Sequence, residues 1–207
     1  MVSVTEILDY FLERPLVDWM VRDPKKAKQV SEEAKRIGSA TDLLIQADVR
    51  GTPVELPVKD VPVMNCLEGW RKFKVAYPLF TTQIQAMQRE ISQGEIIGHP
   101  DFLMEWSDRP GRWGIVDLKC ANQIRPGYWT QVAAYAWLKS PELNPDVLGI
   151  LRLDKERADF EYVELTDPSE IDYEVQIWLD YKQLYFHRQR VAERRRTQKE
   201  DEVLHVS

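Results

Sequence analysis

Apolar positions recur at helical spacing in three segments before residue 78, and the pattern predicts helices over 3–13, 31–49 and about 61–76. The first segment begins with Ser3 and Glu6 at capping-box spacing, and Pro15 lies just beyond its end. Gly51 is a plausible stop for the second segment. The third follows Asp60, with a proline just inside the helix, which is a common way for a helix to begin.

The pattern changes after residue 80, where alternating and continuous apolar runs bounded by turn residues are typical of strands. Strands are expected over 81–91, 95–106, 113–119, 147–154 and 159–165. A tight turn at 92–94 joins the first two strands. Helices are expected over 128–140 and from 168 onward. This order predicts a mixed α/β domain built around one sheet.

The strand over 113–119 carries two opposite charges near its end. Side chains two residues apart on a strand point to the same face, so Asp117 and Lys119 project together, away from Val116 and Leu118. Asp101 lies at the corresponding stage of the preceding, antiparallel strand. Two carboxylates this close repel each other, and a divalent cation bound between them removes that cost. A D-x-K pair on its own is more often an exposed ion pair.

The helix over 128–140 places three polar or aromatic side chains, Tyr128, Gln131 and Tyr135, on one face. A separate apolar stripe has the same spacing and is expected to pack on the sheet. Its members are Trp129, Val132, Ala133 and Ala136. Gln131 and Tyr135 can then face the carboxylates, although in isolation they would be read as the boundary of an ordinary amphipathic helix.

The segments "GHPDF", "IVDLK" and "QVAAY" occur in this order, and the combination resembles the PD-(D/E)xK nuclease superfamily. The nearest resemblance is to its RecB-like and lambda-exonuclease-like branch. It covers roughly residues 30–165 in element order and is motif-specific over 98–138. The resemblance implies a restriction-endonuclease-like α/β core of αβββαβ order, with a central mixed sheet flanked by helices. It also implies a single domain over 1–207, with the core at about 30–165 and a basic C-terminal helix at about 168–200.

The resemblance implies a Mg²⁺ site, in which Mn²⁺ can substitute, held by Asp101, Asp117 and the backbone carbonyl of Leu118. The family has a further histidine ligand on a helix before the sheet. The segment "RIGSATD" places Asp42 at that position, which is a departure that keeps the ligand role open. Glu90 is the alternative acidic ligand.

The resemblance also assigns roles in hydrolysis of a DNA backbone. Lys119 would position the attacking water, and Gln131 and Tyr135 would hold the active-site helix and a phosphate. Further side chains could contact DNA through charge or stacking. They are Arg71, Lys72, Lys74, Tyr128, Arg194, Arg195 and Arg196.

Charge is unevenly distributed over the 207 residues, whose formal net charge is −6. Residues 182–200 hold seven Lys or Arg against two Glu, a local charge of +5, which leaves −11 for the rest. Such a basic segment is either a phosphate-binding arm or a solvated helix end, where cations suit the helix dipole.

Cysteine usage excludes several kinds of site. The two cysteines are too few for a disulfide framework, a four-thiolate zinc site or an iron–sulfur cluster. No apolar run approaches a membrane span, and the first residues lack the pattern of a secretory leader. A soluble cytoplasmic protein is therefore expected.

Together these features predict a Mg²⁺-dependent deoxyribonuclease. An exonuclease that digests linear single- or double-stranded DNA is favoured. The process would be recombination, repair or viral DNA processing. A structure-specific endonuclease and a catalytically idle fold that binds DNA are the alternatives. The sequence leaves open whether the chain forms a homo-oligomer or works with a recombination partner protein.

Overall fold

The structure is a computed structural model that describes residues 1–11, 14–55, 59–105 and 111–205. The helices are α1 (Val4–Asp9), α2 (Arg14–Arg22), α3 (Pro24–Val49), α4 (Val61–Ala76), the 3-10 helix η1 (Thr81–Gln83), α5 (Pro126–Lys139) and α6 (Pro168–His205). The strands are β1 (Val2–Ser3), β2 (Ile84–Met87), β3 (Ile91–Gln93), β4 (Ile96–Gly98), β5 (Phe102–Glu105), β6 (Trp113–Cys120), β7 (Val147–Asp154) and β8 (Asp159–Leu165).

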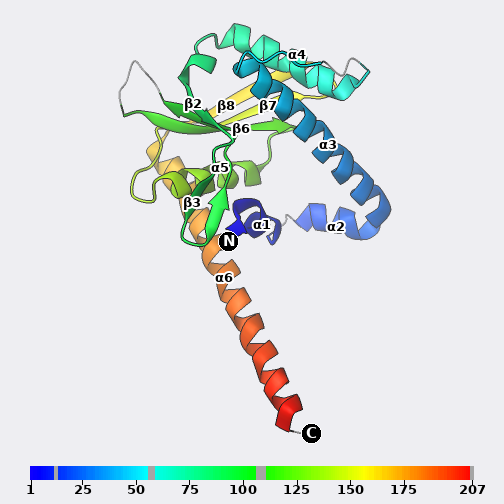
Figure 1. Cartoon of the computed structure of the whole chain (residues 1–207), viewed down its shortest axis with the longest axis vertical. Coiled ribbons are helices and arrows are strands. Elements are labelled where there is room, and N and C mark those ends of the chain that lie inside the picture. Colours follow the sequence, from blue (N-terminus) through cyan, green and yellow to red (C-terminus); the bar gives the residue numbers. More distant parts are fainter. Residues whose placement is uncertain (12–13, 56–58, 106–110, 206–207) are drawn as a thin grey trace.

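The central sheet is mixed and has the strand order β2-β5-β6-β7-β8. Strands β6 and β7 pair in parallel, with α5 in the connection between them, and the other neighbours are antiparallel. Helices α3 and α4 lie on one side of this sheet and α5 lies on the other (Figure 1). The predicted α/β class, with a central mixed sheet flanked by helices, is therefore confirmed.

Each face of the sheet has its own apolar core, as the alternation along β6 requires. Val116 and Leu118 pack with side chains of α3 and α4. Ile115 points to the opposite face, where it packs with α1, α5 and α6. Asp117 and Lys119 have the same parity as Ile115, so they leave the sheet on the α5 side.

The two strands predicted over 81–91 and 95–106 are each broken in two. The parts nearest the turn, β3 and β4, pair with each other around Gly94, which has a φ of 60°. Together with β1 they form a separate small sheet. The breaks fall at Gln88, whose φ is 49°, and at Pro100, which has no N–H to donate to a ladder. The predicted hairpin is present, but it spans two sheets.

The predicted N-terminal helix over 3–13 is too long, because α1 ends at Asp9 and residues 12–13 lie outside the described part. Its start is correct, and the Ser3 side chain accepts a hydrogen bond from the N–H of Glu6 at 3.0 Å. Helix α3 begins at Pro24 rather than at residue 31. Asp23 caps it by accepting from the N–H of Lys26 at 3.1 Å.

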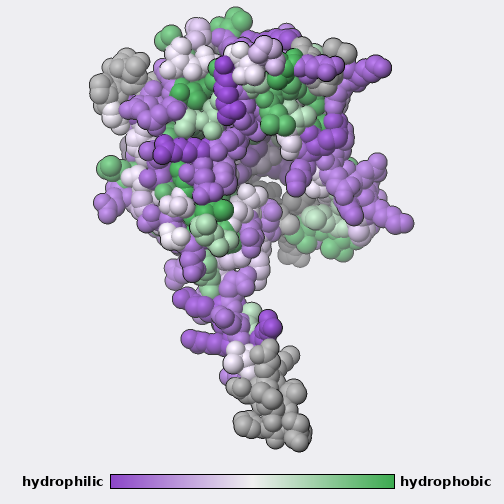
Figure 2. Space-filling view, viewed as in Figure 1, coloured by the Kyte–Doolittle hydropathy of each residue, from purple (hydrophilic) through white to green (hydrophobic). Residues whose placement is uncertain are grey.

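The long helix α6 packs on the body only through its first half. Its core residues end at Tyr185 and Phe186, and the rest of the helix projects from the body (Figure 1). The projecting part is largely hydrophilic up to the grey end (Figure 2). Within the described ranges, no helix is long and apolar enough to cross a membrane.

Candidate active site

A cavity of about 230 Å³ opens where the end of β6 meets the start of β5 and the middle of α3. The register pairs Phe102 with Val116, which sets Asp101 opposite Asp117 in continuation of the ladder. The polar side chains that line the cavity include Asp42, Asp101, Asp117, Lys119, Gln131 and Tyr135. Residues separated by more than ninety positions in sequence thus share one cavity.

A continuous row of polar contacts runs from β6 to α5. The Nζ of Lys119 lies 2.5 Å from Oδ2 of Asp117. Asp117 is buried, with 2% of its surface exposed. The same Nζ donates to Oε1 of Gln131 at 2.9 Å. Nε2 of Gln131 in turn donates to the hydroxyl of Tyr135 at 2.8 Å. Gln131 and Tyr135 therefore hold the Lys119 ammonium in a fixed position.

The surroundings of Lys119 and Tyr135 set the protonation states of both side chains. Burial alone would lower the pKa of Lys119, but the nearby Asp117 and Asp101 carboxylates raise it above its usual value. Burial, and then the charge of Asp117, raise the pKa of Tyr135 to about 12. Lys119 is thus an ammonium at neutral pH and acts as a cation rather than a base, and Tyr135 is a neutral phenol.

Asp101 is held by both of its carboxylate oxygens. The backbone N–H of Leu118 donates to Oδ2 at 2.6 Å, and Nε2 of Gln88 donates to Oδ1. Burial, followed by the charge of Asp117, raises the pKa of Asp101 well above its usual range. Asp117 is therefore close enough to disfavour the charged form of Asp101, as expected from the strand pairing.

The structure separates the two alternatives for a third acidic group. Asp42, on α3, lines the cavity, and its Oδ2 accepts from Nε2 of Gln46 at 2.8 Å. Glu90 lies before β3 rather than at the end of a strand. It is exposed and pairs with Nε2 of His99 at 3.5 Å. Asp42, not Glu90, shares the cavity with Asp101 and Asp117.

Three residues near the cavity were not predicted from the pattern. His99 lines it, two residues before Asp101, which is the spacing that places two side chains on one face of a strand. Cys120 lines it from the last position of β6, where the continuing strand could have indicated it. Gln88 contacts Asp101 from the end of β2, and no sequence signal indicates this contact.

Helix α5 is buried on more sides than the predicted apolar stripe implies. Tyr135 is only 5% exposed, and Thr130, Ala134 and Leu138 are buried as well. The reason is that α1, α6 and the small sheet also pack on α5. Gln131 and Tyr135 reach the cavity from inside the protein rather than from a solvated helix face.

The residues predicted to contact DNA fall into three groups. Tyr128 is half-buried beside the cavity, with its ring centre 5.1 Å from Nζ of Lys119. Arg194, Arg195 and Arg196 are exposed on the projecting part of α6. The cations of α4 each pair with a carboxylate outside the cavity: Arg71 with Glu68 at 3.3 Å, Lys72 with Asp159 at 3.9 Å and Lys74 with Asp48 at 2.6 Å.

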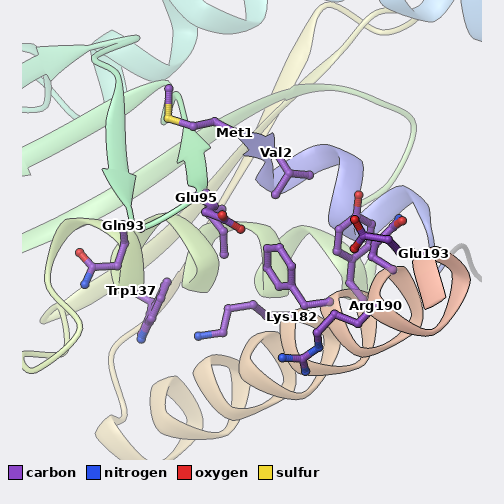
Figure 3. Close-up of a pocket in the computed structure, with 13 residues that line it drawn as sticks. Met1, Val2, Gln93, Glu95, Trp137, Lys182, Arg190 and Glu193 are labelled. Atoms are coloured by element: carbon purple, nitrogen blue, oxygen red, sulfur yellow. The ribbon is translucent and has the colours of Figure 1, made fainter. Parts of the chain in front are cut away.

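A larger pocket of about 830 Å³ lies between α6, the β3–β4 turn and the N-terminal residues (Figure 3). Nζ of Lys182 lies 3.9 Å from the ring centre of Trp137 in this pocket. The lining includes a second cation, Arg190, and two carboxylates, Glu95 and Glu193. The formal charges of these four side chains sum to zero.

The donors of the smaller cavity suit a hard divalent cation. Apart from its ion pair, the buried Oδ2 of Asp117 has no hydrogen-bond partner among the described residues. Carboxylate oxygens are the ligands that Mg²⁺ prefers. In the described ranges, however, no three His, Cys, Asp or Glu side chains are grouped closely enough to hold a metal ion as they stand. The carboxylates would have to turn toward an ion as it binds.

No protein-family model and no curated protein matches this sequence. Among 24 similar solved chains is SSO0001, with a TM-score of 0.43 and 13% identity over 88% of this chain and 75% of that one. Another is LHK-Exo in complex with dAMP, with a TM-score of 0.38 and 14% identity over 93% of each chain. Both TM-scores are low, so neither similarity carries a functional argument.

Proposed function

We propose that this protein is a divalent-metal-dependent deoxyribonuclease of the PD-(D/E)xK type. The observation that carries the proposal is the meeting of Asp101, Asp117 and Lys119 in one cavity, with the Lys119 ammonium held by Gln131. Two carboxylates and a fixed ammonium are the groups needed to bind a cation and to stabilise charge on a phosphate.

The carboxylates of Asp101 and Asp117 would hold Mg²⁺ or Mn²⁺, with the Leu118 carbonyl and Asp42 as further oxygen donors. When bound, the ion supplies Lewis-acid polarisation of a phosphoryl oxygen and lowers the pKa of a coordinated water. The hydrogen bond from the Leu118 N–H fixes Asp101 for this role, so only Asp117 and Asp42 need to reorient.

Lys119 would donate hydrogen bonds to the attacking water and to the phosphate as its negative charge grows. Its raised pKa supports this role, because a permanent ammonium stabilises charge without losing its proton. Gln131 keeps the ammonium from swinging toward solvent, and Tyr135 fixes the orientation of the Gln131 amide. The ring of Tyr128, with its centre 5.1 Å from Nζ of Lys119, offers this ammonium a cation–π contact.

The favoured substrate is linear DNA digested from an end, as the Q-x-x-x-Y pattern of α5 implies. The second candidate is an idle nuclease fold that binds DNA. The absence of a formed three-ligand group in the described ranges favours it.

The test is a cleavage assay on end-labelled linear DNA and on closed circular DNA, with Mg²⁺, Mn²⁺ or EDTA. Lys119→Ala is the variant, and Lys28→Ala is the matched control, because Lys28 is an exposed lysine in a long surface pair with Glu32. Metal-dependent loss of linear DNA is expected, reduced about 10²–10³-fold by Lys119→Ala and unchanged by Lys28→Ala.

Cutting of closed circles would instead identify an endonuclease. Absence of cleavage with either metal, together with salt-sensitive DNA binding, would overturn catalysis in favour of the idle fold. Equal loss of activity in both lysine variants would contradict the assignment of Lys119.

A further inference from the structure

Gln88 has a backbone conformation that residues other than glycine seldom adopt. Its φ is 49°, in the left-handed region, at the point where β2 ends. Its N–H donates to the carbonyl oxygens of Pro100 at 3.1 Å and Asp101 at 3.3 Å. The main chain of Gln88 is therefore held directly beside Asp101. Such conformations persist where the surroundings fix them and are concentrated at functional sites.

The side chain of Gln88 links the two walls of the cavity. Its Nε2 donates to Oδ1 of Asp101 on the sheet side, and its amide lies close enough to the Asp42 carboxylate on α3 to oppose the rise in the pKa of Asp42 that burial causes. Asp42 and Asp101 are 59 residues apart in sequence, on different layers of the fold. Gln88 lies near both carboxylates.

The amide suits this place because it donates hydrogen bonds without carrying charge. A lysine or arginine here would neutralise the carboxylates and compete with a divalent cation. A glutamate would add a further negative charge. An amide N–H occupies one lone pair of a carboxylate oxygen and leaves the second lone pair available to a ligand.

We propose that Gln88 is a positioning residue that orients Asp101 and Asp42 toward the divalent cation. The inference rests on the proposed metal site and concerns the arrangement of its ligands. Groups that hydrogen-bond metal ligands fix ligand orientation, and their loss typically costs 10–100-fold in metal affinity.

The experiment measures Mn²⁺ binding to the full chain by titration calorimetry, without DNA, so the readout does not depend on catalysis. Gln88→Gly is the main variant, because glycine accepts the positive φ and removes only the side chain. Gln88→Ala removes the same side chain but keeps the backbone strain. Gln85→Ala is the matched control, since Gln85 lies on the same strand and donates to Glu105 at 2.5 Å, outside the cavity.

Both Gln88 variants should bind Mn²⁺ about 10–100-fold more weakly, Gln85→Ala should bind like wild type, and Gln88→Gly should keep its melting temperature. Wild-type affinity or tighter binding in Gln88→Gly would overturn the inference and leave the metal site intact. If the wild-type protein binds no Mn²⁺, the inference and the proposed metal site both fail. Weak binding by Gln88→Ala alone would assign the effect to backbone strain and would also overturn the inference.

Discussion

Gly98 is the position where one added methyl group should disturb the candidate active site most directly. A Cβ at this position, on β4, would lie 2.7 Å from both Cδ1 and Cε1 of Tyr135 and 3.0 Å from Cδ1 of Leu138. Tyr135 is 5% exposed and Leu138 is 3% exposed. Both side chains are buried and the contacts with Tyr135 are shorter than real Cβ contacts, so Gly98→Ala must push the Tyr135 ring.

The expected cost of Gly98→Ala is that of an overpacked core, about 1–3 kcal/mol. For a chain of this length, each 1 kcal/mol lowers the melting temperature by about 2–4 °C, so a decrease of about 2–12 °C is expected. A displaced ring also loses the hydrogen bond that Gln131 donates to its hydroxyl, so Lys119 loses part of its support. Metal-dependent nuclease activity should fall together with stability.

Thermal and urea unfolding of a double-mutant cycle would measure this effect. In a Tyr135→Ala background the ring is absent, so Gly98→Ala should cost at least about 0.5 kcal/mol less than in wild type. Gly127→Ala is the control, because a Cβ there meets no atom within 4 Å and alanine favours the helix. An unchanged melting temperature for Gly98→Ala, or an equal cost in both backgrounds, would refute the reasoning.

Three further predictions concern pH, thiol reactivity and salt. The hydrogen bond from Arg36 holds the pKa of Asp60 below its usual 3.8. The carboxylate therefore stabilises the fold above that pH and ceases to do so as pH falls through the lower folded-state pKa. Unfolding curves should show Asp60→Asn less stable than wild type at neutral pH, with a difference that shrinks in acid, and a constant difference would contradict this. N-ethylmaleimide should label Cys120, which lines the cavity, before it labels the fully buried Cys66, and mass spectrometry would show the order. The adduct on Cys120 should weaken Mn²⁺ binding. Labelling of Cys66 first would argue against this geometry. Replacing Arg194–Arg196 with alanine should reduce the salt dependence of DNA binding by up to about 2.7 in log–log slope, since each phosphate contact contributes about 0.9, and an unchanged slope would exclude these arginines from the interface.

The sequence was sufficient for features that depend on neighbouring residues. Alternation alone separates Asp117 and Lys119 from Val116 and Leu118, and the structure shows the latter two in the core on the α3 side. A short connection makes β5 and β6 antiparallel, which brings Asp101 opposite Asp117. These are local rules of pleat and turn, so they hold before any tertiary contact is known.

Prediction failed or stayed open where distant segments had to meet. The strand predicted over 95–106 is divided between two sheets, because the chain leaves one sheet and enters another around Pro100. The choice between Asp42 and Glu90 depended on where α3 packs. Arg71 pairs with Glu68 of its own helix, but folding brings acids from other segments against Lys72 and Lys74.

The sequence by itself determined the α/β class and the pairing of an aspartate and a lysine on one strand face, because periodicity and turn chemistry act within a few residues. Only the tertiary structure decided that α3 supplies Asp42 and that Gln88 lies near both Asp42 and Asp101. It also decided that Gln131 and Tyr135 reach the cavity from a helix that is buried on several sides. Those contacts arise from the packing of layers on both faces of the sheet, and no local pattern encodes which side chains such packing brings together.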